Sequence, residues 1–201
     1  MSRPRRLRRA ELPADTVELA RYLIGKVVVH DTAAGRLSGR IVETEAYPVG
    51  DSAGHAFIGK THRNRSLFLE RGHAYVYLCY GTSFLLNVTS EVPGVGAGVL
   101  LRAIEPLEGI GEGRLGRGPG RLTRALHVDL SQDGWDLCGG GPLWLAASAQ
   151  QAGAIGKSIR IGITRNAHRH LRFYEIGNAH VSGGKKINNQ LDRTSTCRSA
   201  T

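Results

Sequence analysis

The sequence predicts an α+β domain whose sheet is mainly antiparallel. Segments with the composition of strands outnumber the helical segments, and neighbouring strand segments are often too close in the chain for crossover helices between them. Two of these segments, residues 75–79 and 84–89, are joined through Gly81-Thr82-Ser83, which is typical of a hairpin tip. A chain of 201 residues is long enough to bury a core as a single domain.

A few helices are expected beside this sheet. Asp15 has the position of an N-cap, and the apolar residues after it recur with helical spacing up to Gly25, which ends the helix. A second, short helix is expected at residues 119–127. Strands are expected at residues 26–30, 39–47, 75–79, 84–89, 99–105, 143–146, 159–163 and 171–176.

The composition divides the chain into three parts. Residues 1–13 contain five arginines and are expected to form a basic flexible arm. Residues 14–182 are expected to form the folded domain, and the polar residues 183–201 a disordered tail.

The charge of the chain points to a polyanionic partner. There are 27 Lys and Arg residues against 17 Asp and Glu, which gives a formal net charge of +10. Such an excess favours nucleic acid first and an anionic membrane surface second. A basic protein without any polyanionic partner remains the alternative.

The cysteine and apolar patterns bear on location and cofactors. The three cysteines form no Cys-x-x-Cys pair and the eight histidines are scattered, which argues against a disulfide framework and a metal site. We expect no cofactor. No apolar run approaches the ~20 residues of a membrane span, and no secretory signal follows Met1. The expected location is the cytoplasm, at the nucleoid of a bacterium, or the nucleus of a eukaryote.

Two glutamates share one face of the strand expected at residues 39–47. Because side chains alternate along a strand, Glu43, Glu45 and Tyr47 point to the same side. Burying a carboxylate is unfavourable unless the group is paired or used, and two carboxylates this close push their pKa values apart, as acid–base chemistry requires. The alternative is an edge strand with both glutamates in solvent.

Three further features could belong to the same site. They are the loop histidine His55, the tyrosines Tyr75, Tyr77 and Tyr80 around the hairpin, and Arg102 within an apolar strand. Aromatic rings stack on nucleobases, and a paired carboxylate can activate water. Each feature also has an ordinary structural explanation: strand aromatics, a loop histidine and a buried salt-bridge partner.

Several motifs follow one another in a single order along residues 14–182. They are Arg40-Ile-Val-Glu-Thr-Glu-Ala-Tyr47, His62-Arg-Asn-Arg65, Tyr75-Val-Tyr77, Tyr80-Gly81, Asn87, Val99-Leu-Leu-Arg102, Gly118-Pro-Gly-Arg-Leu122, Ile159-Arg-Ile-Gly162 and Arg172-Phe173. Together they resemble the alkyladenine (3-methyladenine) DNA glycosylase family. The resemblance implies a single domain with a curved antiparallel sheet and a protruding hairpin that enters the DNA minor groove. It also implies removal of alkylated or deaminated purines in base excision repair.

The resemblance also implies roles for individual residues. Glu45 matches the general base, and Arg102 the arginine that helps hold the water and the flipped nucleotide. Tyr47, His55 and Tyr77 match the base pocket. Asn87 matches the asparagine that crowds the 2-amino group of guanine, and Tyr80 the side chain that fills the gap left by the flipped nucleotide.

This chain departs from the family pattern at two places. The hairpin tip, Thr82-Ser83, is smaller and more polar than in vertebrate members, and the loop at residues 48–54, which precedes His55, is slightly shortened. Basic side chains for the DNA backbone are expected at Arg63, Arg65 and Arg121.

The expected function is that of a monofunctional DNA glycosylase. It would act on duplex DNA with damaged purines of the 3-methyladenine, hypoxanthine and ethenoadenine class, as a monomer. No lysine occupies the core motif, so water rather than a Schiff base is expected to attack. Two alternatives remain: a glycoside hydrolase that uses Glu43 and Glu45, and a non-catalytic nucleic-acid-binding module.

Overall fold

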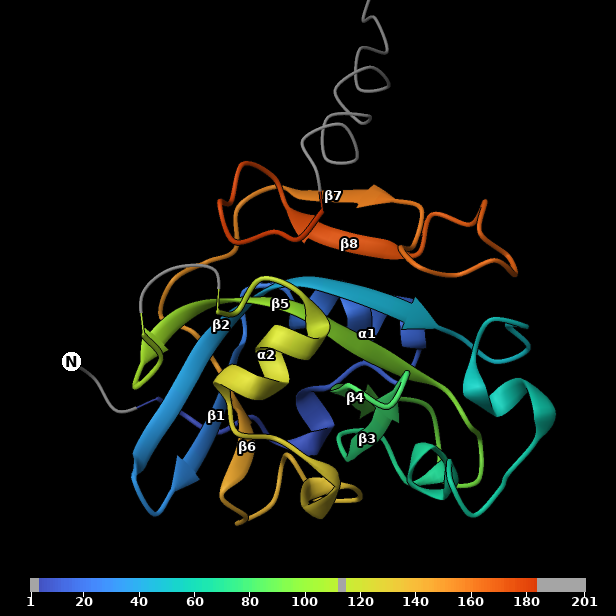
Figure 1. Ribbon diagram of the computed structural model, residues 1–201, viewed down its shortest axis with the longest axis horizontal. Helices are drawn as coiled ribbons and strands as arrows, with labels where there is room; N and C mark the ends of the chain where they lie inside the picture. Colours follow the sequence, from blue (N-terminus) through green and yellow to red (C-terminus); the bar gives the residue numbers. More distant parts are fainter. Residues whose placement is uncertain (1–3, 112–114, 184–201) are drawn as a thin grey trace, which may run out of the picture.

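The computed structural model describes residues 4–111 and 115–183 (Figure 1). Its two α-helices are α1 (Thr16–Leu23) and α2 (Pro119–Ala125). Short 3-10 helices lie at Arg9–Glu11, His55–Ile58, Arg65–Phe68 and Leu130–Gln132. The strands are β1 (Val27–Thr32), β2 (Gly35–Tyr47), β3 (Ala74–Cys79), β4 (Ser83–Thr89), β5 (Gly98–Glu108), β6 (Leu143–Ala146), β7 (Ile155–Ser158) and β8 (Arg172–Glu175).

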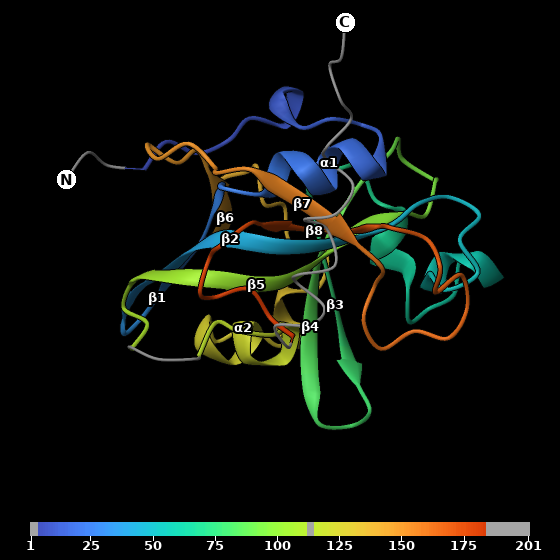
Figure 2. The ribbon, with the colours of Figure 1, turned by 90° about the horizontal axis from the view of Figure 1, so that it is seen from above.

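These strands form one curled sheet, and every pairing in it is antiparallel. The strand order is β3-β4-β5-β2-β1-β6, while β8 pairs with β2 and β7 pairs with β8. In Figure 2 the β3–β4 hairpin extends beyond the rest of the molecule. The α+β class, the curved antiparallel sheet and the protruding hairpin are therefore confirmed.

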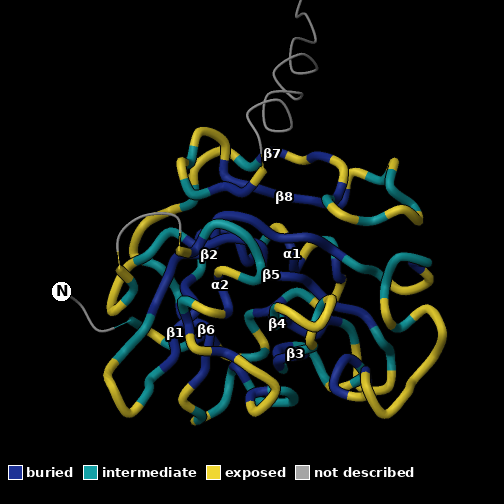
Figure 3. Tube along the Cα trace, viewed as in Figure 1, coloured by how far each residue is buried: buried dark blue, intermediate teal, exposed yellow. Residues whose placement is uncertain are grey.

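The long strand β2 is the centre of this arrangement. It spans 13 residues and pairs with β1, β5 and β8. Its residues from Ser38 to Ala46 are buried, and Figure 3 shows the buried stretch running along the strand. A strand covered in this way gives its side chains a fixed position, because both of its edges are hydrogen-bonded.

Helix α1 forms as the sequence predicts. One carboxylate oxygen of Asp15 accepts hydrogen bonds of 2.8 Å from the backbone N–H groups of Val17 and Glu18, which caps the first turn. Gly25 follows the helix with φ of +83°, a conformation that favours glycine. The Thr44 hydroxyl donates to the Ala20 carbonyl at 2.8 Å and so fastens the helix to β2.

The N-terminal segment differs from its prediction. Leu7 and Leu12 are 1% and 3% exposed, and the Leu7 N–H donates to the Leu145 carbonyl of β6 at 2.9 Å. The flexible-arm prediction is therefore wrong for residues 5–12, because the two leucines are buried and Arg9 forms an ion pair of 2.7 Å with Asp136. The limits of the folded domain remain a prediction, and the tail at residues 184–201 lies outside the described residues.

One predicted strand is also wrong. Residues 159–163 form a loop, and the strand lies earlier, at Ile155–Ser158. The guanidinium of Arg160 turns inward, and Gly162 has φ of +79°, so this segment leaves the extended conformation. Within the described part of the chain, no helix has the length and apolar character needed to span a membrane.

Candidate functional site

Both glutamates of β2 are fully buried, at 0% exposure. The edge-strand alternative is excluded, because β5 and β8 pair with this part of β2. The guanidinium of Arg102, on β5, contacts both carboxylates: its Nε lies 3.0 Å from Glu43 Oε1, and one Nη lies 3.2 Å from Glu45 Oε2. The alternation in β2 thus places the two acids on one face, against one shared arginine.

The Glu45 carboxylate accepts two further hydrogen bonds. The Ile161 N–H donates to Oε1 at 2.8 Å, and the Tyr47 hydroxyl donates to Oε2 at 3.0 Å. Burial raises the pKa of Glu45, and the charge of Arg102 with these two hydrogen bonds offsets that effect only in part. A buried carboxylate with a raised pKa accepts a proton more readily than an exposed one, while Arg102 stabilises its charged form.

The pKa of Glu43 is shifted in the opposite direction from that of Glu45. Burial alone would raise its pKa, but the charges of Arg172 and Arg102, with hydrogen bonds from Arg172 and Ser182, lower it below its ordinary value. Two neighbouring carboxylates therefore have pKa values shifted in opposite directions. The low pKa of Glu43 suits a permanent anion, whereas that of Glu45 suits proton transfer.

A pocket of about 700 Å³ lies beside the two glutamates, Glu43 and Glu45. The side chains that the sequence predicted for one site and that line this pocket are Tyr47, His55, Tyr75, Tyr77, Tyr80, Asn87 and Arg102. Glu45 is not part of the wall; Tyr47, Arg102 and Ile161, which contact it, are. The carboxylate therefore lies directly behind the lining of the pocket.

Aromatic rings form one side of the pocket. Tyr75 and Tyr77, two positions apart on β3, are stacked with ring centroids 5.4 Å apart, and His55 meets Tyr77 edge-on at 4.5 Å. Burial, and then the charge of Arg63, lower the pKa of His55, which favours the neutral imidazole. Rings fixed in this way present a flat surface to another ring.

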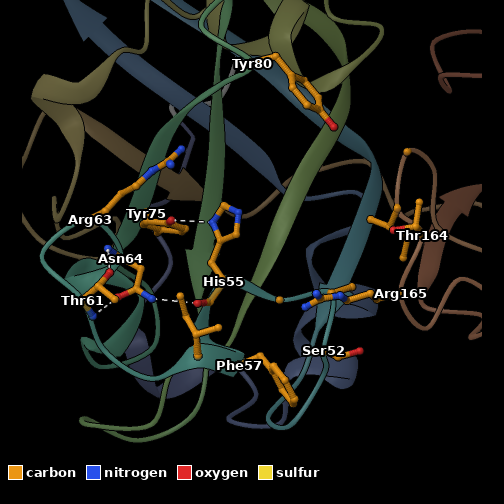
Figure 4. Close-up of a pocket in the computed structure, with 15 residues that line it drawn as sticks. Ser52, His55, Phe57, Thr61, Arg63, Asn64, Tyr75, Tyr80, Thr164 and Arg165 are labelled. Atoms are coloured by element: carbon orange, nitrogen blue, oxygen red, sulfur yellow. Dashed lines mark hydrogen bonds between the residues drawn. The ribbon is translucent and has the colours of Figure 1, made fainter.

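His55 is held in place by Tyr75. Its Nδ1 lies 2.8 Å from the Tyr75 hydroxyl, as the dashed line in Figure 4 marks. Both residues also line an adjoining pocket of about 450 Å³, together with Phe57, Arg63 and Arg165. The sequence analysis counted Tyr75 among the tyrosines that could belong to the site but gave it no role of its own; its shared face with Tyr77 was the available signal.

Asn87 lies on β4, opposite Tyr75 in the strand pairing, and is 6% exposed. Its amide Nδ2 donates to the Tyr75 carbonyl at 3.1 Å. This bond fixes the orientation of the amide at the pocket wall.

Tyr80 is at the tip of the β3–β4 hairpin. It is 90% exposed and has φ of +48°, and Gly81 follows with φ of +68°. The Thr82 N–H donates to the Cys79 carbonyl, so both central residues of this turn have positive φ. A role of Tyr80 in core packing is therefore excluded, and its ring is free to contact another molecule.

The three predicted DNA-backbone arginines are all exposed; Arg63 and Arg65 share one loop, and Arg121 lies apart from them. Arg63 donates to the Leu78 carbonyl of β3 at 3.0 Å and lines the pocket. Arg65 is outside the pocket, with one Nη 3.1 Å from His62 Nε2. Arg121, on α2, lines a separate cavity that also includes Arg36 and Arg124.

A buried ion pair behind Tyr47 was missed by the sequence interpretation. The guanidinium of Arg160 lies 2.5 Å from the Asp51 carboxylate, donates to the Ala46 carbonyl and sits 4.6 Å from the centre of the Tyr47 ring. It joins the loop before His55 to the loop at residues 159–166 and supports the ring from behind. An arginine between two isoleucines was the available signal.

The described residues contain no group of three or more His, Cys, Asp or Glu side chains arranged to hold a metal ion. What the site offers instead is a buried carboxylate, a guanidinium and stacked rings around a cavity.

Comparison with known proteins gives a consistent result. The family described as "Methylpurine-DNA glycosylase (MPG)" matches residues 10–179. A protein of Mesorhizobium japonicum, named "Putative 3-methyladenine DNA glycosylase", is 62% identical over 189 residues, which is 89% of this chain and 91% of that protein. Proteins with the same name from Paraburkholderia phytofirmans and Rubrobacter xylanophilus are 55% and 46% identical, over 90% and 77% of this chain and 90% and 86% of their own lengths. The chain belongs to the methylpurine-DNA glycosylase family.

Proposed function

We propose that this protein hydrolyses the N-glycosidic bond of alkylated or deaminated purines in duplex DNA, as the first step of base excision repair. The observation that carries the proposal is the buried Glu45–Arg102 pair directly behind a pocket walled by aromatic rings. The substrate class includes 3-methyladenine, hypoxanthine and ethenoadenine. The net charge of +10 suits a DNA partner.

The target base must leave the duplex before it can react. Rotating a nucleotide out of the stack costs a few kcal/mol, which a side chain placed in the gap offsets. Tyr80, exposed at the hairpin tip, is suited to that position. The flipped base would then stack on Tyr47 and Tyr77, and rings attract a positively charged alkylpurine more strongly than a neutral base.

Selection against normal guanine is assigned to Asn87. Its amide is fixed by the hydrogen bond to the Tyr75 carbonyl. The 2-amino group of a purine such as guanine would therefore clash with an amide that cannot move aside. Hypoxanthine and adenine derivatives lack that group.

The chemical step uses water. As the bond breaks, positive charge develops on the sugar, and the ionised Glu45 stabilises it while taking a proton from the attacking water. Arg102 keeps Glu45 ionised and helps to hold the water. The phenol of Tyr47 stays protonated, since burial and the nearby Glu45 charge raise its pKa, and therefore donates to the carboxylate.

The alternatives fit less well. In a glycoside hydrolase two carboxylates flank the bond, but here Glu43 and Glu45 lie on the same face of β2 and contact the same arginine. A non-catalytic binding module would have no use for a buried carboxylate behind a pocket. Action as a monofunctional monomer in the cytoplasm remains part of the proposal.

The test is Glu45→Gln. This change keeps the size of the side chain but removes the base, and we expect single-turnover release of hypoxanthine from duplex DNA to fall about 10²- to 10⁴-fold. Binding to the damaged duplex should persist. Glu18→Gln, at an exposed position on α1, is the matched control and should release the base at the wild-type rate. Normal release by Glu45→Gln would disprove the role of Glu45.

A further inference from the structure

Glu43 takes no part in the water-activating step proposed above, yet it is the most heavily bonded carboxylate near the pocket. Its Oε1 accepts hydrogen bonds from Arg102 Nε at 3.0 Å, Arg172 Nε at 2.7 Å and the Ser182 hydroxyl at 2.9 Å. Its Oε2 accepts one from the Ser182 N–H at 2.6 Å. Glu43 is fully buried and is not part of the wall of the pocket beside Glu45.

The contacts of Glu43 determine how Arg102 is turned. The Nε edge of the guanidinium faces Glu43, and one Nη faces Glu45. Because a guanidinium is planar and rigid, fixing the Nε edge also fixes the direction of the Nη groups. Arg102 is 7% exposed and lines the pocket. Its orientation therefore determines which of its N–H groups face the pocket.

Glu43 is itself held from a third strand. Arg172, on β8, donates to Glu43 and is fixed by the Ser158 hydroxyl at 2.8 Å and the Ser182 carbonyl at 3.0 Å. The anchor for Arg102 is therefore attached to β8 and to the segment after it. Such an attachment keeps a charged group within the small tolerance that catalysis requires.

We propose that Glu43 is a positioning residue, which orients Arg102 toward Glu45 and balances the positive charge behind the pocket. Two carboxylates and two guanidiniums, those of Glu43, Glu45, Arg102 and Arg172, form a cluster without net charge. This inference rests on the proposed function, because it assumes that Glu45 is the base.

A consequence for the charge state of Glu45 follows. In a strand, residues two apart lie about 6.6 Å from each other, so the negative charge of Glu43 helps to raise the pKa of Glu45. Without it, Arg102 and Arg172 would act on Glu45 alone and lower that pKa. The titratable and charged groups that face or flank Glu45 are Glu43 and Tyr47 on β2, Tyr77 on β3, Arg102 on β5, Arg172 on β8 and Arg160 in the loop at residues 159–163. The Ile161 N–H of the same loop also bonds to it.

The experiment is Glu43→Gln in the full chain, with single-turnover release of hypoxanthine from duplex DNA measured from acidic to neutral pH. We expect a rate about ten- to a hundredfold lower near neutral pH, because Arg102 loses its anchor. We also expect the rise of the rate with pH to occur at lower pH than in the wild type. A purely structural role would not move that rise.

Glu175→Gln is the matched control. Glu175 is another buried carboxylate paired with an arginine, Arg40, but it contacts neither Arg102 nor Glu45. It should lower the melting temperature and leave the pH of the rise unchanged. The proposal is overturned when Glu43→Gln gives the same pH profile as Glu175→Gln, or when it removes activity as completely as Glu45→Gln.

Glu43→Asp separates charge from position and serves also where Glu43→Gln does not fold. It keeps the negative charge but withdraws the carboxylate from Arg102 by one methylene group. The rise of the rate should then stay at the wild-type pH while the rate itself falls; a shifted rise would contradict the proposal. Wild-type protein that releases no damaged purine would instead reject the proposed function.

Discussion

Tyr80 has surroundings unlike those of the other aromatic residues in the described chain. Its ring is 90% exposed, and its backbone has φ of +48°, which is unfavourable for a bulky residue. The turn between β3 and β4 imposes this conformation, since the Thr82 N–H bonds to the Cys79 carbonyl. The hairpin thus holds an apolar ring in water, where it gains nothing for folding.

Tyr80→Ala tests the role proposed for that ring. Stacking on a base is worth roughly 1–3 kcal/mol, so we expect single-turnover release of hypoxanthine from duplex DNA to fall about five- to 150-fold, with an unchanged melting temperature. Tyr80→Phe keeps the ring and should release the base at nearly the wild-type rate. A marked drop in melting temperature for Tyr80→Ala would show that the ring contributes to folding instead.

At the scale of elements, the basic loop at residues 61–65 lies beside the β3–β4 hairpin. Arg63 donates to Leu78 of β3, so the loop lies beside the strand that leads to Tyr80. Both Arg63 and Arg65 are exposed. We infer that this loop contacts phosphates next to the flipped nucleotide.

The salt dependence of binding to undamaged duplex DNA tests the loop. Each lost phosphate contact should reduce the slope of log K against log salt by about 0.9. Replacing Arg63 and Arg65 by Gln together should therefore reduce it by about twice that amount.

Arg8→Gln is the control for the loop variants. The Arg8 side chain is 82% exposed, and its segment lies on the side of the molecule opposite the hairpin tip (Figure 2). It should keep the wild-type slope. An equal decrease in slope for Arg8→Gln would mean that the whole surface, and not the loop, binds DNA.

At the scale of the whole molecule, the sequence predicted those helices and strands that depend on interactions between residues close together in the chain. Asp15 and Gly25 define α1, and the apolar run of β6 was predicted with its observed limits. The N-terminal segment could not be predicted in this way, because its stability depends on contacts of Leu7 with a strand near residue 145.

In the candidate site, too, features set by neighbouring residues could be predicted, and contacts between distant segments could not. The strand period indicated that Glu43 and Glu45 share a face, and an arginine in an apolar run pointed to Arg102; the choice of Glu45 as the base came from the family resemblance and stays a prediction. The arginine between two isoleucines signalled that Arg160 is buried, but its partner Asp51 could not be predicted, since the pair joins two loops that are distant in the sequence. The anchoring of Glu43 by Arg172 likewise depends on the pairing of β2 with β8.

The acid stability of the fold should depend on Glu175. Hydrogen bonds from Arg40 lower its pKa from 4.5 to about 2, against the opposing effect of burial. Because this pKa is lowered in the folded state, the stabilisation is complete above 4.5 and is lost as the pH falls toward about 2. In Glu175→Gln the free energy of unfolding should depend less on pH within that window. Curves for variant and wild type that stay parallel would contradict this.

The order of strands in the sheet has a last consequence, for how the proposed site meets a lesion. From β3 and β4, which carry Tyr80 at their tip, hydrogen-bonded neighbours lead through β5 directly to β2 and Glu45. Adjacent strands are spaced by about 4.7–4.9 Å, and hydrogen bonds fix their register. Hydrogen-bonded strand pairings therefore fix the position of the proposed wedge, Tyr80, relative to the proposed base, Glu45. Alignment with the damaged position would come from this fixed interval, without domain closure.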